Sequence, residues 1–348
     1  TSHVQKYINL SNEIQKNHSA LLMLDNGKWG CKNELLEKFR HYSGVERVKL
    51  VSPVEATQIL NTADYKLGIF SSNYRKGHVG NSDILACRSR GSKSLQLSEM
   101  PVDFYYAGSD YVSLISEEIE SMISNKFKNY GNSKVIYSNC FLWDVVSPNS
   151  NLENKDLFFE KYCLQKDNPF FIWTPDSIQC QHQEAQEVYE EVCKLDNVIV
   201  KLHPNEVRRH KAERVNFKWS YDLYSSNKVR VLESQDTHYA YKYCDAVISY
   251  QSSIGWEIPA YEKPVIYINK NSENNLLFNS TSSNFYNKQF DFVGHECDLV
   301  NLESFIREQK YLLNNDYQNY KDIYLKESGK NSYEIISEQV TEILNGKI

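Results

Sequence analysis

The chain has 348 residues, of which 39 are Lys or Arg and 45 are Asp or Glu, so its formal net charge is −6. This acidic balance excludes a protein that coats nucleic acid through a generally basic surface. No apolar run comes near the roughly 20 residues of a membrane-spanning helix. With 41% hydrophobic and 24% charged residues, the composition is that of a folded globular protein. At roughly 100–200 residues per domain, the length predicts two domains.

The eight cysteines are spread along the chain, and none belongs to a C-x-x-C motif. Neither a zinc site nor a redox pair is therefore encoded locally. Most of them adjoin apolar residues, as Cys87 and Cys244 do, where a free thiol behaves as a small hydrophobe. We expect reduced core cysteines in a cytoplasmic protein. The sequence starts without a basic-then-apolar leader, so no signal peptide is expected.

Short β-branched apolar segments alternate with longer amphipathic ones in the first half, which is typical of parallel α/β units. Strands are expected over residues 20–24, 48–51, 67–70, 94–97, 104–107 and 134–137. Helices are expected over residues 34–42, 53–60, 80–88 and 113–126. Together they predict a first Rossmann-like domain over residues 1–147.

The polar segment 146–154 contains Pro148 and predicts a linker. A second Rossmann-like domain is expected over residues 152–315, with strands at 170–174, 198–202, 229–232, 246–249 and 265–268 and helices at 183–194, 238–244 and 254–261. From about residue 302 the chain reads as helical to its end. The apolar stripe between residues 333 and 344 predicts that residues 316–348 pack back onto the first domain. The fold class is therefore α/β, with two Rossmann-like domains facing a cleft and ligands at the carboxyl ends of strands.

The first motif follows the strand at residues 198–202 and consists of His203 and Pro204. A histidine at a strand's carboxyl end can donate a hydrogen bond to a phosphate oxygen, and the proline fixes the turn that aims it. Lys201 adds positive charge, as do the basic residues 208–211. The alternative is a surface turn followed by a solvated basic helix.

The second motif follows the strand at residues 246–249, where Ser252 and Ser253 precede a helix. Helix N-termini bind anions because their first N–H groups are unpaired, and serine hydroxyls add further donors. Glu257, one turn into that helix, can accept hydrogen bonds from ribose hydroxyls. The alternative is that the serines only cap the helix.

The two motifs and the following residues 263–266 together resemble the C-terminal half of GT-B glycosyltransferases. The pattern is most similar to bacterial surface-polymer transferases: CDP-glycerol glycerophosphotransferases, capsule polysaccharide transferases, and CMP-sugar-dependent sialyl- and Kdo-transferases. The resemblance covers roughly residues 168–268, and residues 133–144 are similar to the crossover strand that closes the first GT-B domain. The chain departs from the glycerophosphotransferase pattern in having Tyr250-Gln251 before the serines and Lys201-Leu202 before His203.

This resemblance implies an acceptor-side first domain and a nucleotide-binding second domain. In the second domain, residues 232–238 would form the nucleobase loop. The residues implied to bind the donor nucleotide and its phosphate are His203, Ser252, Ser253, Glu257, Thr174, Asp176, Ser177 and Lys201.

Candidates for the catalytic base lie in the first domain. Glu99 and Asp103 follow the strand at residues 94–97, and His78 lies in a basic, glycine-containing loop. A carboxylate or imidazole there can take the proton of an acceptor hydroxyl. In a retaining enzyme one carboxylate can act as the nucleophile instead. The alternative is that these residues are solvated loop ends.

The implied function is transfer of a sugar or polyol phosphate from a nucleotide-activated donor, preferably CMP- or CDP-linked, to a carbohydrate acceptor. The pathway would be bacterial capsule, lipopolysaccharide or teichoic-acid-like glycan synthesis, with an acceptor that can be lipid-linked. No metal or other cofactor is required, because His203, the helix start and nearby cations can neutralise the leaving nucleotide. We expect no nucleic-acid partner, and a cytoplasmic location that can include the inner face of the membrane.

Two alternatives remain from the sequence. One is a non-hydrolysing UDP-sugar 2-epimerase, whose Ser-Gly-Gly and paired glutamates are not matched by residues 252–257. The other is a non-catalytic glycan-binding protein on the same fold.

Overall fold

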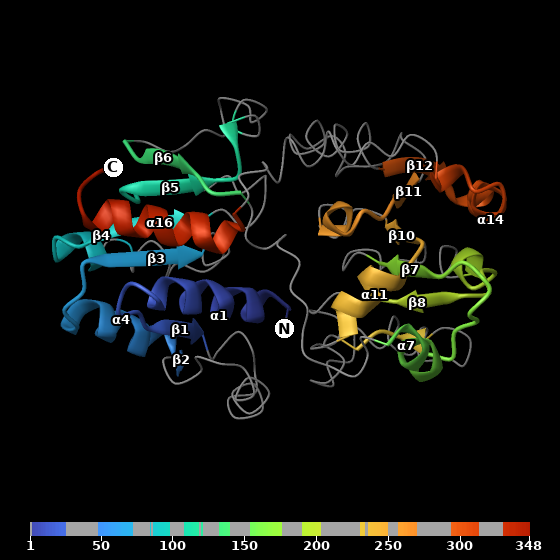
Figure 1. Cartoon of the computed structure of the whole chain (residues 1–348), viewed down its shortest axis with the longest axis horizontal. Helices are drawn as coiled ribbons and strands as arrows, with labels where there is room; N and C mark the ends of the chain where they lie inside the picture. The colour runs from blue at the N-terminus through green and yellow to red at the C-terminus, as the bar shows by residue number, and fades with distance from the viewer. Residues whose placement is uncertain are drawn as a thin grey trace. The chain divides into compact units, whose positions relative to one another are not determined.

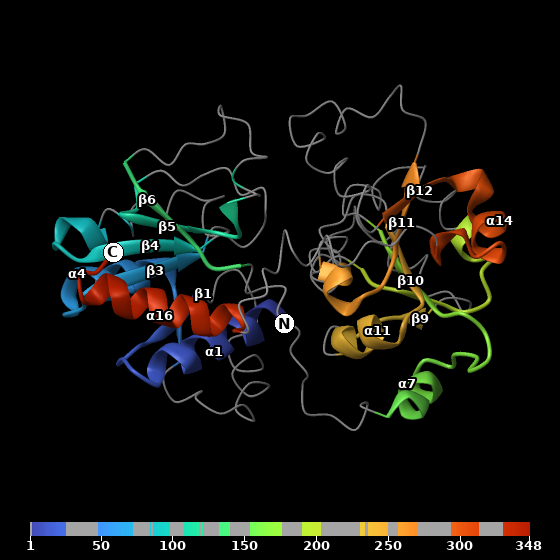
Figure 2. The same ribbon diagram turned by 45° about the horizontal axis from the view of Figure 1, so that its top comes forward.

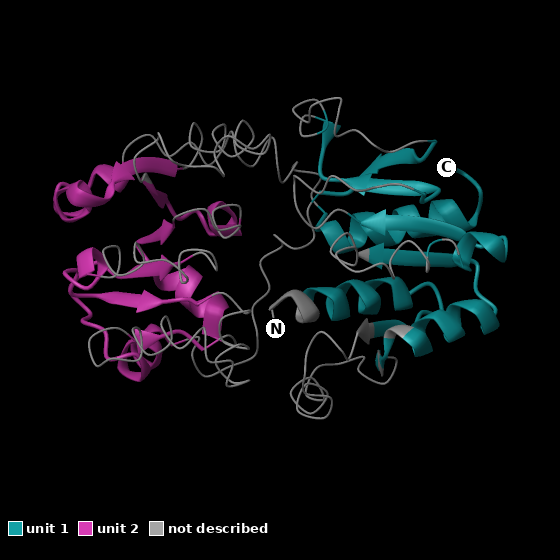
Figure 3. Ribbon diagram, turned by 180° about the vertical axis from the view of Figure 1, so that it is seen from behind, with its two compact units in different colours: residues 1, 3–144, 321–348 teal, residues 2, 145–320 magenta. Residues whose placement is uncertain are grey.

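The computed structural model describes residues 2–25, 48–71, 84, 86–97, 108–117, 120, 132–139, 154–175, 190–202, 230–233, 236–249, 257–269, 294–312 and 330–348. The chain forms two compact units (Figure 3). Unit 1 comprises His3–Asp144 and Lys321–Ile348, and unit 2 comprises Val145–Tyr320. Each unit is a separate α/β structure built on parallel strands.

The strands of unit 1 are all parallel (Figure 1). β1 (Leu22–Asp25) pairs with β2 (Val48–Val51). A four-stranded sheet has the order β3-β4-β5-β6, made of β3 (Leu67–Ser71), β4 (Lys93–Leu97), β5 (Tyr111–Leu114) and β6 (Lys134–Tyr137).

Two helices of unit 1 begin at clear sequence signals. α4 (Pro53–Thr62) and α16 (Ser332–Leu344) both start with a capping box, in which the N-cap side chain and a glutamate three residues on satisfy each other's backbone N–H groups. α1 (Ser2–Gln15) and α16 run beside each other (Figures 1 and 2).

Helix α16 is held against unit 1 by hydrogen bonds to three separate segments of the chain. His18 Nε2 and Thr341 Oγ1 are 2.7 Å apart, and Gln339 Nε2 donates to the carbonyl of Tyr137 at 2.6 Å. Lys93 Nζ donates to the carbonyl of Ile343 in the last turn of the helix at 2.6 Å, and the same carbonyl accepts from the Gly346 N–H at 3.2 Å. The last helix of the chain is therefore part of the first α/β unit.

Unit 2 contains a six-stranded parallel sheet with the order β12-β11-β10-β7-β8-β9. Its strands are β7 (Phe171–Thr174), β8 (Val198–Val200), β9 (Arg230–Val231), β10 (Ala246–Ser249), β11 (Val265–Asn269) and β12 (Gly294–Asp298). The first strand, β7, lies between β8 and β10, so the chain builds the sheet outward in one direction and then in the other. The strand order therefore reverses between β7 and β10.

Both faces of this sheet are covered. α7 (Lys155–Lys161), α11 (Thr237–Tyr243) and the 3-10 helix η8 (Ile258–Tyr261) pack on the face that carries Ile172 and Val247. The 3-10 helices η9 (Leu299–Asn301) and η10 (Lys310–Leu312) and α14 (Leu302–Arg307) pack on the face that carries Trp173 and Ile248. Burial on both faces explains why the central strands are continuous apolar runs rather than alternating ones.

Several sequence-based expectations were wrong in detail. The helix expected over residues 113–126 overlaps β5, whose four residues are all buried between β4 and β6. The helix expected over residues 254–261 is helical at Glu257, the first residue of it that is described, and continues as the 3-10 helix η8, where Pro259 in the first turn cannot donate a helical hydrogen bond. The continuous helix expected from residue 302 onward is interrupted, because α14 ends at Arg307. The strand expected at 104–107 and the helix expected at 34–42 lie outside the described residues.

The five cysteines in the described part of the chain are free thiols. Cys87, Cys244 and Cys297 are buried, as expected, whereas Cys163 is exposed. Burial raises the pKa of Cys244 to about 12 and that of Cys297 to about 11, so these thiols stay protonated at neutral pH.

No helix within the described ranges is both long and apolar enough to cross a membrane.

Candidate functional site

The candidate site begins where the strand order of unit 2 reverses, at the carboxyl ends of β7 and β10. The register of these strands pairs Thr174 with Ser249, the last residue of each. In doubly wound sheets ligands bind outside the carboxyl ends of the strands at this reversal. The topology therefore selects this edge before any side chain is considered.

Polar side chains form a row along that edge. Thr174 and Ser249 are completely buried, and Thr174 Oγ1 donates to the carbonyl of Ile248 at 3.1 Å. Lys201 follows β8, and its N–H donates to the carbonyl of Trp173 at 2.8 Å, which continues the ladder beyond the strand. Because side chains alternate along strands, Lys201, Thr174 and Ser249 belong to the face covered by α11 and η8.

Lys201 is the cation of this row, and its environment perturbs it. Burial lowers the pKa of its ammonium group, and the nearby carboxylate of Glu257 only partly opposes that effect. Glu257 directly precedes η8 and is half-buried. A cation that has lost solvent is stabilised by an anion beside it, and a ligand phosphate could supply a second one.

Tyr241 and Tyr261 lie near Glu257, and His238 contacts Tyr261. The rings of Tyr241 and Tyr261 meet edge to face with centroids 5.4 Å apart, and His238 Nδ1 is 3.1 Å from the Tyr261 hydroxyl. Burial, reinforced by Glu257, raises the pKa of both tyrosines well above the ordinary value, so their hydroxyls stay neutral donors. The Tyr241 hydroxyl is buried and has no hydrogen-bond partner among the described residues.

The predicted donor-binding residues divide into two groups. Thr174, Lys201 and Glu257 are described, and the structure brings Lys201 close to Glu257 and into the same row as Thr174. The others follow the carboxyl ends of β7, β8 and β10 in sequence but lie outside the described residues; they are Asp176, Ser177, His203, Ser252 and Ser253. The predicted catalytic candidates His78, Glu99 and Asp103 also lie outside them.

Sequence reasoning missed Tyr241 and Tyr261. Both belong to helical segments whose aromatic residues read as ordinary core. Their positions in the sequence were a signal, because both segments adjoin strand ends that had been selected as sites. That signal could identify the two tyrosines only once the packing of α11 against η8 was known.

Polar contacts also occur at the carboxyl ends of β5 and β6 in unit 1. The buried hydroxyls of Ser113 and Ser138 are hydrogen-bonded to each other, and the Tyr137 hydroxyl donates to Glu120. These groups satisfy one another, so they present no unused donor there.

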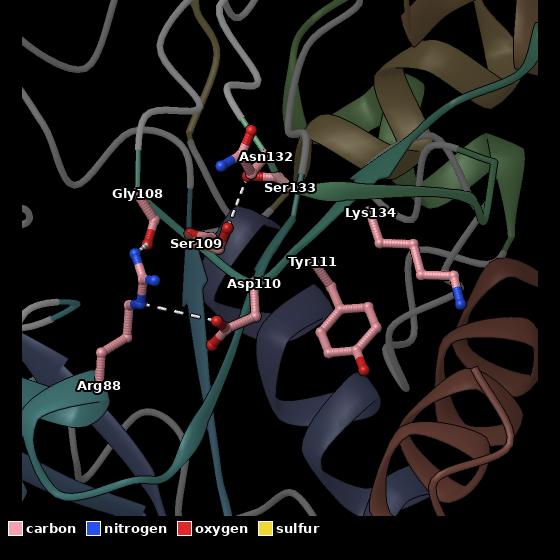
Figure 4. A pocket seen from close by; sticks show the side chains of 8 residues that line it. All are labelled: Arg88, Gly108, Ser109, Asp110, Tyr111, Asn132, Ser133 and Lys134. Atoms are coloured by element: carbon pink, nitrogen blue, oxygen red, sulfur yellow. Dashed lines mark hydrogen bonds and ion pairs between the residues drawn. The ribbon is translucent and has the colours of Figure 1, made fainter.

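The opposite, amino-terminal edge of unit 1 holds a pocket of about 380 Å³ (Figure 4). Arg88 contacts Asp110 at 3.5 Å and donates to the carbonyl of Gly108 at 2.8 Å, and Ser133 Oγ donates to the carbonyl of Ser109 at 2.5 Å. None of the predicted site residues that the structure describes lines it. We therefore do not assign the nucleotide site to this pocket.

The described part of the chain holds no group of three or more His, Cys, Asp or Glu side chains placed to bind a metal ion.

No protein-family model and no curated protein matches the sequence. Solved structures are similar to it. UDP-GlcNAc 2-epimerase from Neisseria meningitidis bound to UDP-GlcNAc gives a TM-score of 0.55 at 14% identity, over 98% of this chain and 96% of that one. The glycosyltransferase SnogD from Streptomyces nogalater gives 0.59 at 10% identity, over 98% and 96%. The wall teichoic acid polymerase TagF gives 0.56 at 10% identity, over 100% and 98%.

At these identities the likeness shows the fold alone. It extends over nearly the whole chain, and the parallel α/β sheets of both units agree with it. The chain therefore has the GT-B type of fold, with two Rossmann-like domains, and the predicted fold class is confirmed.

Proposed function

We propose that this chain is a transferase that binds a nucleotide-activated donor at the carboxyl edge of the unit 2 sheet. The donor's sugar or polyol phosphate passes to a carbohydrate acceptor. The observation that carries the proposal is the row of Lys201, Thr174 and Ser249 at the strand-order reversal, with Glu257 beside it. A half-buried cation next to two hydroxyls at strand ends is a suitable binding site for a phosphate group.

Each residue has a separate role in this proposal. Lys201 pairs with the donor phosphate and stabilises the negative charge that builds up on the leaving nucleotide. Thr174 Oγ1, fixed on the Ile248 carbonyl, holds the ends of β7 and β10 together beneath the phosphate. Glu257 accepts hydrogen bonds from the ribose hydroxyls.

The remaining parts of the proposal come from the sequence. His203, Ser252 and Ser253 add donors to the phosphate, and Asp176 and Ser177 line the same pocket. The acceptor's proton goes to Glu99, Asp103 or His78. We propose a CMP- or CDP-linked donor and an acceptor in bacterial surface-glycan synthesis at the inner face of the membrane.

The fold similarity to UDP-GlcNAc 2-epimerases supports a second candidate, a non-hydrolysing UDP-sugar 2-epimerase. The two candidates differ in what they need. An epimerase converts its UDP-sugar without an acceptor, whereas a transferase releases nucleotide only when an acceptor takes the group.

Binding measurements test the site. Calorimetric titration with CMP, CDP and UDP should detect binding to the wild type. Lys201→Gln should weaken it about 10- to 150-fold, the effect of losing a hydrogen bond between charged groups. The matched control is Lys194→Gln, because Lys194 is exposed, pairs with Glu191 and precedes β8 at the other edge of the sheet.

Product assays with CMP-, CDP- and UDP-linked donors then separate the candidates. Acceptor-dependent nucleotide release supports the transferase, and acceptor-independent conversion of a UDP-sugar supports the epimerase. Equal affinity of Lys201→Gln and wild type would refute the site, and binding without turnover of any donor would indicate a non-catalytic protein.

A further inference from the structure

The pocket at the amino-terminal edge of the unit 1 sheet has no part in the proposed donor site (Figure 4). Residues 108–110 lead into β5 and residues 132–133 lead into β6, and both segments line it. Sites for small ligands have volumes of about 300–1,000 Å³. At about 380 Å³ the pocket is large enough for one small ring, and the groups that line it decide which kind.

The carboxylate of Asp110 is held in one orientation at the wall of this pocket. Its Oδ2 accepts hydrogen bonds from the N–H and the hydroxyl of Ser94, both at 2.8 Å. The Asp110 N–H donates to the same hydroxyl at 2.9 Å, and Ser94 is completely buried. Because Oδ2 is engaged with β4, the second oxygen, Oδ1, is the one that stays available to a ligand.

The guanidinium of Arg88 is placed beside that oxygen. Its Nη1 donates to the carbonyl of Gly108 at 2.8 Å, and its Nε lies 3.5 Å from Asp110 Oδ1. Within the described part of the chain, Arg88 Nη2 has no hydrogen-bond partner. Lys134 also lines the pocket, but its ammonium group extends away from Arg88 (Figure 4). Arg88 and Asp110 are therefore the two charged groups that face a ligand together.

Fold stability gives little reason for this pair. The side chains of Arg88 and Asp110 are 48% and 34% exposed, and ion pairs at such positions contribute little. What the arrangement does fix is a donor next to an acceptor. A hydroxyl group both accepts and donates hydrogen bonds, so two neighbouring hydroxyls match the pair: one accepts from Arg88 and the other donates to Asp110.

The other polar groups of the pocket also suit a neutral ligand. An anion at Arg88 would meet the carboxylate of Asp110, and a cation at Asp110 would meet the guanidinium. The Ser133 hydroxyl donates to the carbonyl of Ser109 at 2.5 Å, so its oxygen remains an acceptor for the ligand. Asn132 is exposed, and its amide, a donor and an acceptor, has no hydrogen bond among the described residues.

We propose that this pocket binds a neutral sugar unit of a glycan, with Arg88 donating to one ring hydroxyl, Asp110 accepting from its neighbour and Asn132 contacting a further hydroxyl. The site is separate from the strand ends that carry the proposed donor-binding and catalytic residues. It does not rest on the proposed function, because a sugar bound here needs neither a donor nor turnover. The pocket gives the protein a contact with carbohydrate at which no group is transferred.

The test titrates sugars into the full chain and follows binding by saturation-transfer NMR. The probes are the methyl glycosides of glucose, galactose and mannose, which present neighbouring hydroxyls in different relative orientations. We expect wild type to bind at least one of them with a millimolar dissociation constant. Arg88→Gln should weaken that binding about tenfold or more, the effect of losing a hydrogen bond to a charged group.

Two controls accompany this comparison. Arg90→Gln removes the same charge from an exposed residue that does not line the pocket, and it should bind the sugar as wild type does. The fully O-methylated form of the best probe keeps the ring but has no hydroxyl to donate, and it should not bind.

Every other outcome overturns the proposal. Absence of binding by all three probes, or equal affinity of Arg88→Gln and wild type, shows that the pocket is not a sugar site. An equal loss in Arg90→Gln indicates a general effect of charge, and undiminished binding of the O-methylated probe excludes recognition through hydroxyls. Should Arg88→Gln not fold, Asn132→Ala replaces it, because Asn132 has no hydrogen bond to lose within the described ranges; unchanged affinity there refutes the site.

Discussion

Replacing Asp236 with alanine should destabilise the chain far more than its place at the start of helix α11, where its side chain makes no cap hydrogen bond, suggests. The substitution removes the acceptor of the Tyr162 hydroxyl. This hydroxyl is buried, and among the described residues it would keep the Glu233 N–H as its one remaining partner. A hydrogen bond to a charged group contributes about 1.5–3 kcal/mol. The contact with Lys161 adds less than about 1 kcal/mol, because that side chain is 34% exposed and can turn to water. We expect a total loss of about 2–4 kcal/mol.

Two measurements check this expectation. Thermal unfolding should shift by roughly 2–4 °C for each kcal/mol lost, the scale for 150–250 residues. Hydrogen exchange should speed up at the Glu233 amide, which donates to the Tyr162 hydroxyl. The matched control is Asp298→Ala, because Asp298 is exposed and its side chain makes no cap hydrogen bond. A loss no greater than that of the control, or unchanged exchange at Glu233, would show that Tyr162 does not couple Asp236 to Glu233.

Two further predictions concern packing and pH. In Gly68→Ala the new methyl group would lie 2.8 Å from two ring atoms of Phe70 and 3.0 Å from Cys87 Sγ. We therefore expect the free energy of unfolding, measured in urea, to fall by about 1–2 kcal/mol. If the double variant with Phe70→Leu regains none of this stability, the clash with Phe70 is not the cause. Raising the pH deprotonates Lys201 and removes the cation, so CDP affinity should fall as the pH rises. Because the pKa of Lys201 is lowered, this fall should begin at a lower pH than it would for an ordinary lysine. Glu257→Gln removes the carboxylate that opposes the lowering, so between pH 7 and 10 its loss of affinity should begin at still lower pH, and a shift toward higher pH would contradict the assignment.

Several strands were predictable from their short apolar runs. Residues 48–51, 134–137 and 246–249 were expected as strands and form β2, β6 and β10 with the same bounds. An apolar, β-branched run between polar turns leaves little alternative for a parallel α/β protein. The fold class follows from these runs and from the amphipathic segments between them.

The elements missed are those whose local pattern conflicts with their place in the fold. β12 has the sequence Gly-His-Glu-Cys-Asp and is an edge strand with one neighbour, so it carries no apolar run to reveal it. The last two residues of β5 were read as the start of a helix, because they continue into a long amphipathic segment. Pairing with β4 and β6 decides its structure, and that pairing is not visible in the segment itself.

Some contacts near the candidate site could be predicted from the sequence and others could not. The difference lies in how far apart in the sequence the contacting residues are. Thr174 and Lys201 were expected to share a site because the carboxyl ends of parallel strands meet at one edge, a rule that needs only the strand positions. The contact between Tyr162 and Asp236 joins residues 74 positions apart, and no spacing rule connects a helix before β7 with a turn after β9. Strand-end chemistry is therefore readable from a parallel α/β sequence, whereas the residues that position the neighbouring turns become visible only when the sheet is assembled.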